Sequence, residues 1–250
     1  MPPSTYPELM AGLLREDAAR PLVTFYDDAT GERVELSVTT FANWVAKTAS
    51  LAQDELGVEP GELVVVDLPT HWLGAVWLLA AWTAGHCVST EPESADRAAL
   101  VVCGPASVER HGRLAATVPV VALSLRPLGG RFTAPLPAGT TDFGAVVLAQ
   151  PDSFSAITPP GPDTAAVEAA GQAWTQRELL AAAAADPSVG AGGRLLTDVN
   201  PCSAEGALLV TSVLLESAST VLVANADHGS WQVRKEQERA TAQRRSGQRE

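Results

Sequence analysis

Cysteine is scarce in this chain. The three cysteines, Cys87, Cys103 and Cys202, stand far apart and show no CxxC spacing, so neither a disulfide framework nor a zinc site is predicted. We interpret them as small buried residues. The motifs GxSxG, HExxH, GxGxxG and Walker A are absent too, so the sequence offers none of these hydrolase, metalloprotease or nucleotide-binding signatures.

A membrane-spanning run is also missing. The most apolar stretch, Trp72 to Val88, contains Gly74, Thr83, Gly85 and His86 and falls short of the ~20 apolar residues that a span requires. The N-terminus has no basic segment followed by an apolar one. We therefore expect a cytoplasmic protein with no membrane partner.

Positive charge is in short supply. The chain has 17 Lys and Arg against 29 Asp and Glu, a net charge of −12, and only Lys47 and Lys235 are lysines. Such an acidic body argues against a nucleic-acid partner.

With 46% hydrophobic and 18% charged residues over 250 positions, the composition is globular. We predict one domain over residues 1–228 and a charged, disordered tail over residues 229–250, where apolar periodicity is lost.

The stretch from Gly57 to Pro92 organises the rest of the chain. Leu63 to Leu68 is a short Val-rich run that is typical of a buried parallel strand. A helix from Trp72 to Thr83 is apolar on nearly every face, so it must be covered on several sides, and Gly85 ends it. This pattern is half of a βαβ unit.

The remaining segments continue the alternation of strands and helices. A hairpin over Leu22 to Leu36 is predicted from its polar turn, and Pro-rich loops are predicted over Arg126 to Thr141 and Gln150 to Thr164. Thr175 with Glu178 three residues later is a helix-capping signature. The other predicted helices cover Tyr6–Ala19, Ser37–Leu56, Val108–Thr117, Phe143–Ala149, Thr175–Ala185 and Ser203–Leu215, and the other strands Ala98–Cys103, Val118–Leu123, Thr164–Glu168, Leu195–Val199 and Thr220–Val223.

The order of several motifs resembles the N-terminal part of adenylate-forming enzymes, the superfamily of acyl-CoA synthetases, peptide-synthetase adenylation domains and luciferases. The similar pattern is SVTTF…W…LA…LGVEPGELVVVDLP…AAWTAGHCVSTEP, with Glu62 in place of the usual Asp. Ala173 to Leu180 is similar to the helix start that follows the phosphate-binding loop in that superfamily, and Arg194 to Val223 is similar to its next strand, helix and strand. The resemblance spans about residues 20 to 225 and is closest to short actinobacterial proteins that consist of such an N-terminal piece. It implies a layered αβα domain with mostly parallel sheets.

The chemistry that the resemblance implies is degenerate. The superfamily holds ATP phosphates with a Ser/Thr/Gly-rich loop followed by Pro-Lys-Gly, because free backbone N–H groups and a cation must approach them. We match this loop to residues 155–163, SAITPPGPD, where prolines lack an N–H and Asp163 adds a negative charge. Ser155, Thr158 and Gly161 are the candidate remnants. The later superfamily segments and the C-terminal domain with the catalytic Lys are not found in the sequence.

A second group of candidate ligand-binding residues follows the strand that ends at Leu68. Asp67, Thr70 and His71 lie near a helix N-terminus beyond a carboxyl strand end, where α/β sheets place ligands. The alternative is that Thr70 caps the helix and His71 is solvated. His111 and His228 are expected at the surface, and Cys202 is expected to be structural. No catalytic or metal-binding residue is predicted.

We therefore expect a catalytically degenerate AMP-dependent synthetase/ligase-like protein, a pseudoenzyme that binds a ligand or a partner. The alternative is an acyl-CoA synthetase-like subunit, active in acyl adenylation, that another polypeptide completes. No cofactor is expected, with residual ATP or AMP binding left open. A second copy of the chain or another protein is expected to cover the face where the rest of the parent fold would pack.

Overall fold

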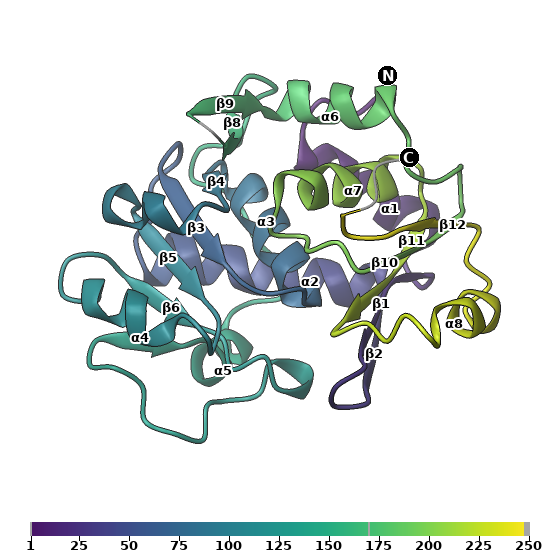
Figure 1. The fold of residues 1–250 in the computed structure, drawn as a ribbon. Coiled ribbons are helices and arrows are strands. Elements are labelled where there is room, and N and C mark those ends of the chain that lie inside the picture. Colours follow the sequence, from purple (N-terminus) through teal and green to yellow (C-terminus); the bar gives the residue numbers. More distant parts are fainter. Residues whose placement is uncertain (1, 170, 248–250) are drawn as a thin grey trace.

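The structure is a computed structural model that describes residues 2–169 and 171–247. Figure 1 shows two β-sheets with helices between and around them. Within each sheet the strands are parallel, except for one antiparallel pair at an edge of each. This is the mostly parallel α/β architecture that the sequence predicts, and the expectation of fold class is confirmed.

The order of the strands across each sheet differs from their order along the chain. Across the five-stranded sheet run β12 (Ala242–Arg244), β10 (Arg194–Thr197), β11 (Ser219–Ala224), β1 (Pro21–Asp27) and β2 (Glu32–Ser37). Across the seven-stranded sheet run β7 (Thr140–Asp142), β6 (Val120–Ala122), β5 (Leu100–Cys103), β3 (Leu63–Asp67), β4 (Cys87–Ser89), β8 (Ala165–Ala169) and β9 (Gln172–Thr175).

The helices connect these strands. They are α1 (Tyr6–Asp17), α2 (Val38–Ser50), α3 (Trp72–Ala84), α4 (Val108–His111), α5 (Phe143–Val146), α6 (Gln176–Ala185), α7 (Ala204–Leu215) and α8 (Trp231–Gln237). Shorter helical turns extend or join them at Leu51–Glu55, Pro92–Arg97, Gly112–Leu114, Pro127–Gly129 and Val147–Ala149.

Helix α3 lies at the centre of the molecule, packed against α1, α2, α7 and strands of the seven-stranded sheet. Twelve of its 13 residues are buried, as its uniform hydrophobicity requires. Trp72, Trp77 and Trp82 are core residues. Gly85 ends the helix in the left-handed conformation, with φ of 84°, which glycine adopts without strain.

Strand β3 divides two apolar layers. Val64 and Val66 face the main core that includes α3, whereas Val65 faces a second cluster with Val101 and Val108. Successive side chains of a strand point to opposite faces, so a strand covered on both sides must be apolar throughout. The Val-rich run therefore identifies β3 as an interior strand.

The prediction of a disordered tail is wrong for residues 231–244. Helix α8 covers the outer face of the five-stranded sheet, and β12 pairs with β10 at its edge. Trp231 is 5% exposed and packs with Leu196, Val221 and Val223. The burial of this ring is hidden in the sequence because one Trp in a charged segment creates no apolar periodicity. Residues 248–250 of the predicted tail lie outside the described part of the chain.

Three further elements differ from the expectation, and one of them is β7, which begins inside the predicted loop over Arg126 to Thr141 and pairs with β6. The helix predicted over Val108 to Thr117 is short, since α4 ends at His111 and is followed by a single 3-10 turn. Strand β9, which the sequence does not predict, has no alternating burial pattern. Within the described ranges, no helix is long and apolar enough to cross a membrane.

Candidate functional site

The loop with the candidate residues Ser155, Thr158 and Gly161 lies at the edge where β4 and β8 begin. The side chain of Gln53 accepts from the backbone N of Ile157 at 2.9 Å and donates to the carbonyl of Ser155 at 3.3 Å. The N–H of Gly161 is occupied by the Thr164 hydroxyl at 2.9 Å. The loop is thus tied to the body of the protein, and some of its polar groups are already in use.

The charges around this loop are paired. The ammonium of Lys47 is 3.1 Å from the carboxylate of Asp152 and donates to the carbonyl of Gln150. Asp163 pairs with Arg177 at 3.0 Å. Lys235, the other lysine, lies in α8, which covers the outer face of the other sheet. Neither lysine therefore supplies the loop with an unpaired cation.

The β8–β9 hairpin, rather than the Pro-rich loop, leads directly into α6. Ala169 pairs with Gln172, so only two residues connect the strands. Thr175 and Glu178 then form the predicted capping box at the start of α6. The resemblance matches Ala173 to Leu180 to the helix start that follows the phosphate-binding loop, and β9 and the first turn of α6 are found there. The match to residues 155–163 stays a prediction, and the segment between β8 and β9 is a second candidate position for the same loop.

Asp67 forms an ionic cluster with two residues of α4. Its Oδ2 atom is 2.8 Å from Nε2 of His111 and 2.6 Å from Nη2 of Arg110. Partial burial by itself raises the pKa of Asp67, but hydrogen bonds from His111, Ser107 and Arg110 outweigh it and lower the pKa below its ordinary value. His111 is 2% exposed, so the expectation of a surface histidine is wrong. Asp67 therefore anchors α4 with both partners in place.

His71, not Thr70, caps α3. Its Nδ1 accepts from the backbone N of Leu73 at 3.1 Å, and its ring packs against Phe25 and Trp72 with centroids 4.6 and 5.5 Å away. Burial lowers the pKa of His71 to about 4, so the ring is neutral at pH 7. The alternative that Thr70 caps the helix and that His71 is solvated is therefore wrong in both parts.

The three candidates Asp67, Thr70 and His71 do not converge on one site. Asp67 contacts α4, whereas His71 faces Phe25 of β1. The Thr70 hydroxyl donates to the carbonyl of Asp198 at 3.4 Å, and Asn200 donates to the carbonyl of Leu68 at 2.8 Å. The segment after β3 is thus fastened to the segment after β10, and it joins the two sheets.

The cysteines are structural. Burial raises the pKa of Cys87 to about 11 and that of Cys103 to about 12, and it also raises the pKa of Cys202. All three thiols are therefore protonated at neutral pH, and a thiol is a poor nucleophile. Among the described residues, no group of three or more His, Cys, Asp or Glu side chains is arranged to hold a metal ion.

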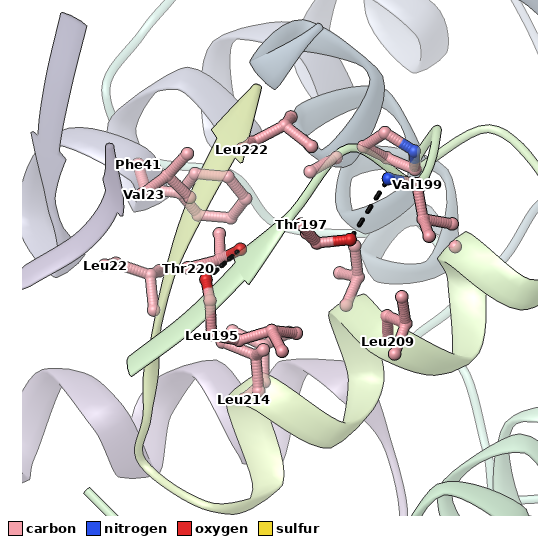
Figure 2. Close-up of a pocket in the computed structure, with 15 residues that line it drawn as sticks. Leu22, Val23, Phe41, Leu195, Thr197, Val199, Leu209, Leu214, Thr220 and Leu222 are labelled. Carbon is pink, nitrogen blue, oxygen red and sulfur yellow. Dashed lines mark hydrogen bonds between the residues drawn. The ribbon is translucent and has the colours of Figure 1, made fainter. Parts of the chain in front are cut away.

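A cavity of about 40 Å³ lies between α7 and the five-stranded sheet (Figure 2). Its two labelled threonines are occupied, because Thr197 accepts from the N–H of Val199 at 3.1 Å and Thr220 donates to the carbonyl of Leu195 at 3.4 Å. The other labelled side chains are apolar: Leu22, Val23, Phe41, Leu195, Val199, Leu209, Leu214 and Leu222. With no free polar group, we interpret it as a packing void.

The fold defines the class of protein: an α/β domain like the N-terminal domain of adenylate-forming enzymes. An acyl-CoA synthetase from Brucella canis matches 95% of this chain with a TM-score of 0.77 and 18% identity. An acetoacetyl-CoA synthetase from Streptomyces lividans matches 97% with a TM-score of 0.77 and 18% identity. The matched part is 47% and 42% of those chains, so this chain spans about half their length.

The family is shown by sequence. A protein of Mycobacterium tuberculosis described as a TIGR03089 family protein is 37% identical over 235 residues, which cover 92% of this chain and 93% of the relative. The chain therefore belongs to the TIGR03089 family. No family model matches the sequence.

Proposed function

We propose that this chain is a non-catalytic module of the adenylate-forming fold that binds a ligand or a protein partner. The observation that carries the proposal is the antiparallel pairing of β8 with β9, which reaches Ala169 and Gln172 and leaves two positions between the strands. A loop that wraps a polyphosphate needs several backbone N–H groups directed at the phosphates. Two positions between paired strands leave room for too few of them.

The surroundings of the Pro-rich loop support the same proposal. Asp163 would bring a negative charge toward the phosphates, and its partner Arg177 is already neutralised by it. Lys47 is held by Asp152. Binding a polyphosphate at this loop would therefore require breaking existing pairs and overcoming like-charge repulsion.

Nucleotide binding tests the proposal directly. A ligand that binds the native state stabilises it by about 2.7 kcal/mol at 100 times its Kd, so binding of a nucleotide would raise the melting temperature. The purified chain should show no such increase with ATP or AMP at millimolar concentration. An acyl-CoA synthetase measured in parallel is the positive control. A saturable, nucleotide-dependent stabilisation of this chain would count against the proposal.

A further inference from the structure

Two connected hollows run along α1, and the larger one reaches Pro162 and Arg177 beside the Pro-rich loop. One, of about 570 Å³, lies where β1, β10 and β11 begin. The other, of about 810 Å³, follows α1 toward residues 2–4. Glu16, Leu215 and Ser217 line both, so the hollows form one groove. Helix α1 has 12 residues and is therefore about 18 Å long, a length that about five extended residues span.

The guanidinium of Arg20 lies in the wall of this groove, and two of its three nitrogens have no hydrogen-bond partner among the described residues. Nη1 of Arg20 donates to the carbonyl of Ala218 at 2.8 Å, whereas its Nε and Nη2 atoms are buried without a hydrogen-bond partner among the described residues. Buried donors without partners are rare and costly. Nε and Nη2 form one edge of the guanidinium, the fork that binds both oxygens of a carboxylate.

The charges around this fork are mostly negative. Glu16, Asp17 and Glu216 line the same hollow, and its second arginine, Arg194, is paired with Glu238. A polyanion would be repelled by these carboxylates. A ligand with one carboxylate and a neighbouring positive charge matches both the fork and the rim.

The second hollow adds an apolar floor. Leu9, Leu13, Leu214 and Leu215 contribute to its lining, and a Cβ built on Gly12 meets nothing within 4 Å. Apolar side chains of an extended segment can lie on this floor while its polar backbone faces solvent. This combination favours a peptide over a small, highly charged metabolite.

We infer that the groove along α1 binds the C-terminal segment of a partner protein, with the terminal carboxylate on Arg20, a basic side chain near Glu16 and Asp17, and an apolar side chain against Leu215. The fork is shielded from solvent in the structure. Docking therefore requires the side chains that cover the fork to move, and Glu16 and Ser217, which line both hollows, are hydrogen-bonded to each other at 2.5 Å. The inference does not rest on the proposed function, because Arg20, Glu16 and Asp17 lie in neither candidate position of the phosphate-binding loop.

Fluorescence polarisation with the full chain tests this site. The probe is a fluorescein-labelled peptide of sequence GGLKL with a free C-terminal carboxylate, compared with the same peptide as a C-terminal amide and with GGLEL. The carboxylate form of GGLKL should bind at least about tenfold more tightly than the amide, as expected when a charged hydrogen-bonded pair is lost. GGLEL should bind more weakly than GGLKL, because its glutamate meets the acidic rim.

Variants separate recognition from folding. Arg20→Gln should abolish the difference between carboxylate and amide, while Arg113→Gln, at an exposed position, should keep it. If Arg20→Gln fails to fold, Gly12→Phe fills the groove without touching Arg20 and should weaken the binding of GGLKL. Equal binding of the carboxylate and the amide by the wild type, no binding of GGLKL at millimolar concentration, or an unchanged difference in folded Arg20→Gln would each overturn the inference.

Discussion

Single residues show where the sequence is informative and where it is not. The helix N-terminus near Pro69 is predictable, because a strand is followed by a long apolar run, but the capping residue is not. Thr70 is the better cap by type, yet its hydroxyl bonds to Asp198 and His71 takes the cap. That choice depends on the neighbouring sheet, which supplies Phe25 against the imidazole ring.

His71 makes stability depend on pH. Its pKa is about 4 in the folded chain against an ordinary value of 6.5, so the unfolded chain binds the proton more readily. Stability from this group is complete above pH 6.5 and is lost as pH falls toward 4. Between pH 8 and pH 5, this linkage amounts to about 2 kcal/mol.

His71→Asn should remove that part of the pH dependence while keeping a good capping residue. Urea denaturation at pH 8 and pH 5 measures the change, with His228→Asn, at an exposed position, as the control. His86, whose pKa is also lowered by burial, remains in both variants. An undiminished loss of stability in His71→Asn would contradict the assignment.

Asp67 is a ligand-binding candidate by sequence, yet its contacts indicate a structural role. His111 lies 44 positions away, and only the pairing of β3 with β5 brings α4 beside it. Asp67→Asn should lower the free energy of unfolding by about 1–3 kcal/mol, because the amide carries no charge and has one acceptor oxygen fewer for the buried His111 and the exposed Arg110. Asp163→Asn, at a solvent-exposed ion pair, should change it by less than about 0.5 kcal/mol. Similar effects of the two substitutions in urea denaturation would count against an anchoring role.

At the scale of elements, periodicity and caps predict most of the helices and strands. The hairpin of β1 and β2, the buried run of β3 and the capping box of α6 follow from local sequence. Elements that depend on a distant partner are missed. Strand β12 has three residues and gains its place only by pairing with β10, and α8 is held by contacts with residues about 200 positions away, such as the Arg234–Asp28 pair at 2.6 Å.

The tail should behave as a docked element rather than a free one. Trp231→Ala should release α8 and β12 while the rest of the domain stays folded, because the ring is the buried anchor of the segment. Limited trypsin digestion should then cleave at Arg234 and Arg239 much faster than in the wild type. Val233→Ala, at an exposed residue of the same helix, should not change the rate. Equally fast cleavage of the wild type would contradict the docked tail.

The glycines within helices are not equivalent, and the structure separates them. A Cβ on Gly206 in α7 would lie 1.9 Å from the carbonyl oxygen of Asn200, whereas one on Gly12 in α1 meets nothing within 4 Å. Gly206→Ala should destabilise the chain by about 3 kcal/mol or more through backbone displacement. Gly12→Ala should stabilise it by about 0.5–1 kcal/mol. Thermal denaturation measures both changes in stability. If both variants were destabilised, or both stabilised, the distinction between the two glycines would be wrong.

At the scale of the whole molecule, the two sheets and the central α3 preserve an architecture shared with acyl-CoA synthetases. The resemblance in the sequence predicts this architecture from the order of weak motifs. It matches the phosphate-binding loop to residues 155–163, and only the strand pairing shows that a β-hairpin lies between that segment and α6. The shared architecture is therefore a finding about this chain, whereas the loss of adenylation chemistry is our proposal for it.

ATP–pyrophosphate exchange by the purified full chain tests the central claim most directly. The assay should include a panel of carboxylic acids, with an acyl-CoA synthetase as the positive control. We predict no exchange above the protein-free background with any acid. Acid-dependent exchange by this chain alone, which disappears on heat denaturation, would show that the β8–β9 hairpin does not prevent adenylation and would contradict the account.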